Sequence, residues 1–336
     1  MRFANIMAGA QHGGAEGFYE RMTLALHRAG EAVLPVIRRD GERAARLRAG
    51  GLTPLELSFG GPLDLLTRPR LRHALRGFAP RVAMVWMNRA ARHTPRGPYT
   101  LVGRLGGYYD LKYYRHCDHL AANTRDLVRW ITAQGWPAER VHHLPNFAED
   151  FQGVAPAHLP GTARRLLALG RLHHNKGFDT LIRAMPHLPA ASLIIAGEGP
   201  ERAALEALAR ECGVAGRVHL LGWQQDAGAL LAACDVFVCS SRHEPLGNIV
   251  LEAWSAARPV VAVAAQGPSE LIRNGETGLL VPPESPEALA GAIGAILADP
   301  LRAATLAAAG RAAFEASHAE APVLSAWRDF LHKLAA

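Results

Sequence analysis

Two glutamates, Glu244 and Glu252, lie on either side of a predicted strand-to-helix turn, with seven residues between them. Gly247 and Asn248 suit such a tight turn, and a helix start leaves backbone N–H groups free to bind an anion. Carboxylates are good acceptors for sugar hydroxyls. Eight helical residues rise about 12 Å, comparable to the distance from a ribose to a hexose across a diphosphate. The pattern predicts a nucleotide-sugar site, although paired glutamates on a helix also occur on solvated surfaces.

A second pattern places two cations, Arg171 and Lys176, five residues apart after Gly170 and a predicted strand. The glycine turn can bring both cations onto one diphosphate. Neutralising a departing phosphate is what glycosyl transfer without a metal ion requires. Lys176 is one of three lysines in the chain, which favours a specific role. The alternative is that both are ordinary loop cations.

The elements that must position these residues follow an alternating pattern in both halves of the chain. Apolar runs of four to six residues separated by helices are typical of buried parallel strands joined by crossovers. Strands are expected at residues 2–7, 32–37, 82–87, 119–122, 166–169, 193–196, 218–220, 236–239 and 260–263, and helices at 178–185, 201–212 and 248–257.

A segment containing proline and glycine, residues 148–162, has neither helical nor strand periodicity and is predicted to be a linker. We therefore expect two tandem Rossmann-like, doubly wound α/β domains, at 1–155 and 156–318, followed by a helix at 319–336. Open parallel sheets bind ligands at the carboxyl ends of their strands. A cleft between the domains is then expected to take a donor on one side and an acceptor on the other.

The spacing of the glutamates, with a glycine three residues after the first, resembles the hallmark of retaining glycosyltransferases of the GT-B fold, and most closely family 4, the group 1 transferases. The resemblance implies that Glu244 contacts the transferred sugar and that Glu252 holds the ribose hydroxyls. It also implies that the amides of the turn contact the sugar and phosphates. These turn residues are Gly247, Asn248 and Ile249. Leu246 stands where the family more often has phenylalanine.

Other segments between about residues 119 and 290 are similar to the same family. The stretch holding Arg171 and Lys176 resembles its Gly-Arg-Leu…Lys-Gly motif, whose basic pair grips the donor diphosphate. Gly197 lies in a turn like the one that relatives place near the nucleotide. Trp223 stands where contacts to the base occur, although a buried core indole is the alternative. The resemblance also implies that the C-terminal helix returns to the first domain.

In the N-terminal half, Gly13 and Gly14 follow the first strand and open a helix. Glycines here let the backbone approach a ligand, and relatives place a similar loop against the sugar or phosphates. Residues 104–114, with Asp118 and residues 123–124, resemble bacterial transferases that build surface polysaccharide or lipopolysaccharide core. Their aromatic and polar side chains suit stacking on sugar rings, and a structural tyrosine cluster is the alternative.

One departure from the family concerns the group that activates the acceptor. Asn88 stands about where many relatives carry a histidine that contacts the sugar. An asparagine can hydrogen-bond a sugar hydroxyl but cannot act as a general base. The activating group is left open among Asp110, His93 and the phosphate of the donor.

These observations predict a retaining, metal-independent glycosyltransferase in lipopolysaccharide or surface polysaccharide biosynthesis, with a nucleotide diphosphate sugar as donor and no cofactor. Arg171, Lys176 and Glu244 are the predicted catalytic residues. The alternatives are a nucleotide-sugar epimerase or hydrolase of the same fold and a non-catalytic nucleotide-sugar-binding protein. A nicotinamide dehydrogenase is disfavoured because Arg202 replaces the third glycine of the dinucleotide fingerprint.

Charge is spread unevenly along the chain. Residues 1–150 hold 22 basic and 13 acidic residues, net +9, and the remainder holds 15 and 17, net −2. A basic half suggests an anionic partner, so a glycan or lipid-linked acceptor and peripheral contact with a membrane are expected. The alternative is a compositional bias toward arginine. No aromatic-interleaved basic motif supports nucleic-acid binding.

The remaining composition indicates a cytoplasmic protein, with the inner face of the membrane as the expected place of contact. No apolar run approaches the roughly 20 residues of a membrane span, and residues 1–7 are too short for a signal peptide. The four cysteines fit no disulfide or metal framework. Adjacent histidines rarely converge on one ion, so no metal is expected.

Overall fold

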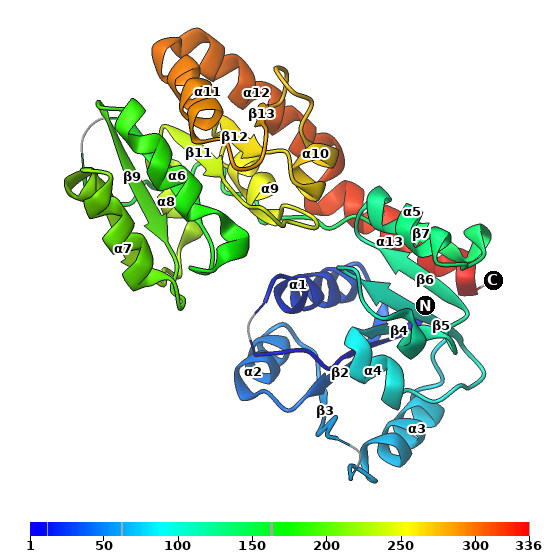
Figure 1. Cartoon of the computed structure of the whole chain (residues 1–336). Coiled ribbons are helices and arrows are strands. Elements are labelled where there is room, and N and C mark those ends of the chain that lie inside the picture. Colours follow the sequence, from blue (N-terminus) through cyan, green and yellow to red (C-terminus); the bar gives the residue numbers. More distant parts are fainter. Residues whose placement is uncertain (12, 62, 162–163, 336) are drawn as a thin grey trace. The chain divides into compact units, whose positions relative to one another are not determined.

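The computed structural model describes residues 1–11, 13–61, 63–161 and 164–335. The chain forms two compact units, one comprising Met1–Phe147 and Glu320–Ala336 and the other Ala148–Ala319. Each unit is a parallel sheet with helices (Figure 1). The doubly wound α/β class expected from the alternating apolar runs is confirmed.

Unit 1 contains a seven-stranded parallel sheet in the order β3-β2-β1-β4-β5-β6-β7. The strands are β1 (Arg2–Met7), β2 (Ala32–Arg38), β3 (Leu55–Leu57), β4 (Val82–Trp86), β5 (Thr100–Leu105), β6 (His119–Ala122) and β7 (Val141–His143). The helices are α1 (Gly14–Arg28), α2 (Gly41–Ala49), α3 (Thr67–Phe78), α4 (Met87–His93), α5 (Arg125–Ala133) and α13 (Glu320–Ala335), with 3₁₀ turns η1 (Leu111–Tyr114) and η2 (Ala138–Arg140).

Unit 2 contains a six-stranded parallel sheet in the order β10-β9-β8-β11-β12-β13. The strands are β8 (Arg164–Leu169), β9 (Ala191–Ala196), β10 (Val218–Gly222), β11 (Val236–Cys239), β12 (Val260–Val263) and β13 (Leu279–Val281). The helices are α6 (Phe178–Ala184), α7 (Arg202–Glu211), α8 (Ala227–Ala233), α9 (Asn248–Ser255), α10 (Gln266–Leu271), α11 (Pro286–Ala298) and α12 (Pro300–Ser317), with 3₁₀ turns η3 (His174–Lys176), η4 (Met185–His187) and η5 (Ala215–Arg217).

Both sheets are buried on their two faces, which explains the continuous apolar runs. Along β1, Phe3 and Met7 belong to one hydrophobic cluster, whereas Ala4 and Ile6 belong to the cluster on the opposite face. The same alternation divides β8 between two clusters in unit 2. Successive side chains of a strand point to opposite faces, so a run that is apolar throughout requires helices on both sides.

The last helix, α13, packs on unit 1. Val323, Trp327 and Leu331 are buried in its core. The indole of Trp327 stacks on that of Trp86, with ring centroids 6.0 Å apart and planes 14° apart, and its Nε1 donates to the carbonyl oxygen of Pro145 at 3.0 Å. Residues from both ends of the chain thus form one core.

The segment expected to link the domains packs on unit 2. The amide of Ala148 donates to the carbonyl of His318 at 3.2 Å, and that of Ala157 donates to Ala229 at 2.9 Å. Unit 1 therefore ends at Phe147, whereas the sequence boundary was placed at residue 155. Residues 162 and 163, which include the end of the expected linker, lie outside the described residues.

Four strands, β3, β5, β7 and β13, were not predicted, and β4 is one residue shorter than predicted. The strand expected to include residue 87 ends at Trp86, because Met87 has a left-handed backbone (φ 71°) and begins α4. Among the described residues no single helix is long and apolar enough to cross a membrane. A bent pair, Pro286–Ala298 with Pro300–Ala335, satisfies length and composition only jointly, with a 103° bend.

Candidate active site

The loops after β8 and β11 meet at the carboxyl edge of the unit 2 sheet, because these two strands are neighbours. Lys176 ends the first loop and Glu244 lies in the second. The ammonium nitrogen of Lys176 lies 2.5 Å from Oε2 of Glu244, and Ser241 donates to the same oxygen at 3.3 Å. The sequence patterns around residues 176 and 244 therefore form one site, with a cation and a carboxylate side by side.

Close backbone packing fixes these loops, and glycine is required at two contacts. Gly197 has a φ of 153°, and a Cβ there would lie 1.8 Å from the carbonyl oxygen of Gly170. Gly177 has a φ of 62°, and its Cβ would lie 2.2 Å from the oxygen of Ser240. Larger residues cannot occupy either place without displacing the loops. Gly197 thus acts through its lack of a side chain.

Arg242, which was not among the predicted site residues, ties the two loops together. Its guanidinium donates to both carboxylate oxygens of Asp179, at 2.6 and 2.8 Å, and to the carbonyl of His174 at 2.9 Å. Its amide donates to Asn175 at 2.8 Å. Burial alone would raise the pKa of Asp179, but the hydrogen bonds and charge of Arg242 lower it to about 2. The signal that could have revealed Arg242 is its place two residues before Glu244.

The predicted turn before α9 is present. Gly247 is left-handed (φ 84°) and α9 begins at Asn248, which leaves the amides of Asn248 and Ile249 without a hydrogen-bond partner in the described part of the chain. Such amides at a helix start attract an anion. The side-chain oxygen Oδ1 of Asn248 is also buried without a partner among the described residues.

The predicted helical spacing of the two glutamates is wrong. Glu244 lies in the loop, and only Glu252 lies on α9, so the stretch between them is not eight helical residues. The rise of about 12 Å therefore does not apply. The loop is instead held against α10, since the amide of Gly267 donates to the carbonyl oxygen of Glu244 at 2.8 Å.

Three further predicted residues occupy different surroundings on unit 2. Glu252 is half-buried on α9. Arg171 is exposed, and within the described residues it has no ion-pair or hydrogen-bond partner. Trp223 follows β10 and is 69% exposed. The alternative of a buried core indole at residue 223 is therefore wrong, and this indole has a free face on which a base could stack.

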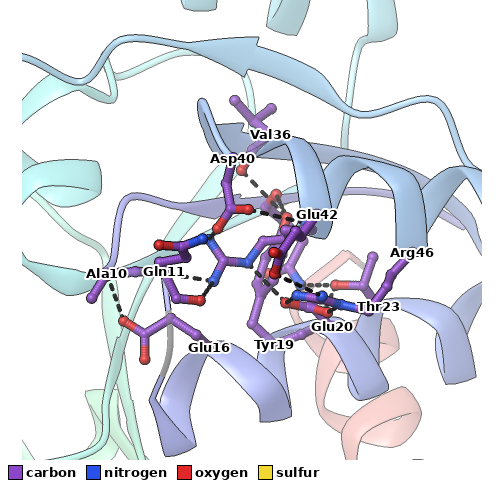
Figure 2. A network of polar contacts seen from close by, with 12 residues as sticks. Ala10, Gln11, Glu16, Tyr19, Glu20, Thr23, Val36, Asp40, Glu42 and Arg46 are labelled. Atoms are coloured by element: carbon purple, nitrogen blue, oxygen red, sulfur yellow. Dashed lines mark hydrogen bonds and ion pairs between the residues drawn. The ribbon is translucent and has the colours of Figure 1, made fainter.

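In unit 1 the glycine loop between β1 and α1 closes over Glu16. Gly14 is the first residue of α1, and a Cβ on Gly13 would lie 2.3 Å from Oε2 of Glu16. The amide of Ala10 donates to Oε1 of Glu16 at 2.8 Å. Figure 2 shows the surrounding polar network. The loop is thus held by a carboxylate that lies directly beneath it.

A buried arginine fixes the same loop from the other side. Arg43 of α2 has no exposed side-chain area and donates to the carbonyl oxygens of Ala10 and Gln11, at 3.0 and 2.9 Å. It also donates to Glu20 at 2.9 Å and forms an ion pair with Asp40 at 3.0 Å. Nε and Nη2 of the guanidinium are hydrogen-bonded, whereas Nη1 has the ion pair with Asp40 but no hydrogen bond within the described residues.

Two cavities of about 430 and 420 Å³ lie beside this loop and share Gly9, Ala10 and Arg38. The second is also lined by Glu16, Asn88, Arg89 and Tyr109. The side chains of Arg38 and Arg89 are exposed and, within the described chain, have no ion-pair partner. The predicted residue Asn88 therefore lies in a cavity that offers two cations.

The two side chains proposed to activate the acceptor do not line these cavities. His93 is buried, with Nε2 3.3 Å from the carbonyl of Gly60. Asp110 forms an ion pair with Lys112 at 2.6 Å, which lowers the pKa of its carboxyl group. Of the tyrosines predicted to stack on sugars, Tyr114 is fully buried in the core and Tyr109 lines the cavity. Burial raises the pKa of Tyr109.

No metal-binding constellation is present in the described ranges, since no three His, Cys, Asp or Glu side chains are grouped to hold an ion. The four cysteines are free thiols.

Comparisons with known proteins decide the family. Residues 163–299 match the model described as glycosyl transferases group 1. Over 300 residues the chain is 37% identical to the lipopolysaccharide core biosynthesis glycosyltransferase LpsE of Rhizobium meliloti. This alignment covers 85% of this chain and 86% of LpsE. The chain belongs to the group 1 glycosyltransferases. The predicted family is confirmed, and the dehydrogenase alternative is excluded.

Other known proteins are similar to this glycosyltransferase over nearly its whole length. It is 33% identical to LpsD of the same organism over 345 residues, covering 99% of this chain and 98% of that protein. HepE of Anabaena, in a crystal structure with UDP, matches with a TM-score of 0.84 at 20% identity, over 99% and 100% of the two chains. The lipopolysaccharide outer core galactosyltransferase WaaB matches with a TM-score of 0.76 at 18% identity, over 99% of each chain. The GT-B fold is thereby confirmed.

Proposed function

We propose that this glycosyltransferase moves a hexose-type sugar from a nucleotide diphosphate sugar to a glycan or lipid-linked acceptor in lipopolysaccharide core biosynthesis, with retention of configuration and without a metal ion. The observation that carries the proposal is the ion pair of Lys176 and Glu244 beside the unpaired amides at the start of α9. One edge of unit 2 thus offers a cation, helix-start amides and a carboxylate, which suit a diphosphate and a sugar hydroxyl.

In the proposed reaction, the bond between the anomeric carbon and the phosphate oxygen breaks, and its electron pair leaves with the nucleoside diphosphate. Lys176, Arg171 and the amides of Asn248 and Ile249 stabilise that charge. The acceptor oxygen forms a bond to the anomeric carbon on the same face of the sugar from which the phosphate departs. The proton of the acceptor hydroxyl passes to a phosphate oxygen. Neither His93 nor Asp110 lines the cavities of unit 1, which favours the donor phosphate as the base.

The nature of the two substrates is supported by the similar proteins. HepE has been crystallised with UDP and with UDP-glucose, so a uridine nucleotide is the first donor to test. LpsE and LpsD are named for lipopolysaccharide core biosynthesis. We assign acceptor binding to the cavity lined by Asn88. We also propose that the reaction takes place in the cytoplasm, because free thiols are typical of reducing compartments.

A thermal-shift panel of UDP, GDP, ADP and NAD tests the donor site on wild type, Lys176→Ala and Lys333→Ala. A ligand at 100 times its dissociation constant adds about 2.7 kcal/mol to the free energy of unfolding. One nucleoside diphosphate should stabilise the wild type and the Lys333→Ala control, whose lysine is exposed on α13. The Lys176→Ala variant should lose the effect. Stabilisation of all three proteins alike would place the nucleotide elsewhere.

The mechanism is tested with the donor identified in that panel. NMR of the glycoside formed should show the same anomeric configuration as the donor, and turnover should persist in EDTA. An inverted product or loss of turnover in EDTA would contradict the proposal. Consumption of the donor at an unchanged rate without any acceptor would instead indicate the hydrolase or epimerase alternative. Nucleotide binding without turnover on any acceptor would indicate a binding protein.

A further inference from the structure

Three leucines on unit 1 are exposed in a turn of four residues. Leu63, Leu65 and Leu66 are 94%, 80% and 58% exposed. Only two other large hydrophobic side chains in the described part of the chain are comparably exposed, Trp223 and Leu301. Scattered exposed leucines are normal, but clustered ones mark an interaction surface.

Asp64 holds the turn that carries these leucines through several hydrogen bonds. The carboxylate of Asp64 accepts hydrogen bonds from the amide of Gly60 and the hydroxyl of Thr67, both at 2.6 Å, and from the amide of Thr67 at 3.0 Å. These bonds, led by that of Thr67, lower the pKa of Asp64. Phe59, which lies before this turn, is buried in a left-handed conformation (φ 43°) that is unfavourable for a bulky residue. The leucines are thus presented by a hydrogen-bonded turn.

The helix after the turn is cationic on its exposed side. Leu71 and Leu75 of α3 are buried in the core of unit 1, whereas the basic side chains of the helix are exposed. The exposed arginines of α3 are Arg68, Arg70, Arg72 and Arg76. None of them pairs with a carboxylate in the described ranges. Residues 65–109 contain nine arginines and no aspartate or glutamate.

A small cavity adjoins this helix and is lined by three arginines. Its volume is about 100 Å³, and its lining includes Arg72, Arg76, Arg96 and Tyr99. The Nε of Arg96 donates to the carbonyl oxygen of His116 at 3.0 Å, which anchors its side chain. Guanidinium groups converging on one cavity suit a phosphate.

We propose that this surface docks the protein on an anionic lipid bilayer. The leucine–arginine surface consists of Leu63, Leu65, Leu66, Arg68, Arg70, Arg72, Arg76 and Arg96. The leucines enter the boundary between headgroups and acyl chains, and the arginines bind lipid phosphates. This inference does not depend on the proposed sugar transfer.

The charge of the surface favours a bilayer over a second copy of the chain. A two-fold dimer would place the same patch of each copy against itself. Two sets of arginines would then face each other without a carboxylate between them, and like charges repel. A membrane rich in anionic lipid supplies both an apolar layer and the opposite charge.

Co-sedimentation of the full chain with phosphatidylcholine vesicles, with and without phosphatidylglycerol, tests the proposal. Three double variants are compared: Leu65→Ser/Leu66→Ser, Arg68→Gln/Arg70→Gln and Leu301→Ser/Arg302→Gln. The last is the matched control, because it removes an exposed leucine and an exposed arginine from α12. All changed side chains are exposed, so circular dichroism and the melting temperature should match the wild type.

Wild type and control should bind only vesicles that contain phosphatidylglycerol. Each arginine removed should weaken partitioning about fivefold, and the leucine variant should lose at least about tenfold. Binding that the leucine variant retains, or that the control loses equally, overturns the proposal. A wild-type dimer in light scattering that the leucine variant abolishes, without vesicle binding, would instead assign the surface to a second copy.

Discussion

The ammonium of Lys176 lies 2.5 Å from a carboxylate oxygen of Glu244, although 68 positions separate the two residues in the chain. Both side chains belong to loops at one end of neighbouring strands, so the parallel sheet itself brings them together. In the proposed reaction, the carboxylate of Glu244 orients the ammonium of Lys176 for the diphosphate of the donor.

Replacing Glu244 with glutamine is expected to separate sugar transfer from nucleotide binding. The amide keeps the size of the side chain but loses its charge, so turnover should fall about 10²–10³-fold, as when one electrostatic stabiliser is removed. Stabilisation by the nucleoside diphosphate should persist, because Lys176 is then free of its anionic partner. Initial rates and thermal shifts measure the two effects. Loss of nucleotide binding equal to that in Lys176→Ala would contradict these separate roles.

Arg242→Gln is expected to loosen the two active-site loops. It removes two charged hydrogen bonds to Asp179, which should lower the free energy of unfolding by about 2 kcal/mol. Misplacement of Lys176 and Glu244 should lower kcat about tenfold to a hundredfold. Arg183→Gln is the control, since Arg183 also pairs with Asp179 but is half-exposed on α6. It should change stability by less than about 0.5 kcal/mol. Chemical denaturation and steady-state kinetics distinguish the variants.

Gly197→Ala is expected to disrupt the loops at the carboxyl ends of the unit 2 strands. The added methyl group would lie 1.8 Å from the oxygen of Gly170, at a backbone conformation that other residues rarely adopt. The free energy of unfolding should fall by about 3 kcal/mol or more. Gly291→Ala, at an open position of α11, should raise it by about 0.5–1 kcal/mol. Urea unfolding measures both, and similar values for the two variants would refute the contact.

The docking of α13 should depend on pH through Glu31. Burial alone would raise the pKa of this carboxyl group, but hydrogen bonds from His332, the N-terminal ammonium of Met1 and Arg328 lower it to about 2. The stabilisation is therefore complete above the ordinary value of 4.5 and is lost as the pH falls toward 2. Glu31→Gln should be about 2 kcal/mol less stable than wild type at about pH 6. Urea unfolding at several pH values should show this difference vanish near pH 2; a constant difference would refute the linkage.

The sequence predicted the elements that follow simple periodicity and missed those that depend on tertiary contacts. Strand β5 was missed because it contains Arg104, which is buried against the rings of both Trp86 and Trp327, with its Cζ 5.5 and 5.3 Å from their centroids. Burial lowers the pKa of Arg104 to about 9. No local pattern indicates that an arginine has aromatic partners 18 positions before it and 223 positions after it.

The candidate site divides in the same way. Lys176, Glu244 and Gly247 could be predicted because their residue types and spacing suit a sugar-nucleotide site. Arg242 could not, because its partners, such as His174 and Asp179, are more than 60 positions away in the chain. The helical spacing of the two glutamates was wrong because periodicity does not indicate where α9 begins. The turn at Gly247 sets that start, and its left-handed conformation is a property of the folded loop.

The position of Trp327 has a consequence for biosynthesis on the ribosome. This indole completes the core of unit 1, yet all of unit 2 is translated before it. Chains usually fold domain by domain from the N-terminus as they emerge. Here the first 147 residues must wait with Trp86 and Phe18 uncovered until α13 is made, so the second unit can reach its native state before the first.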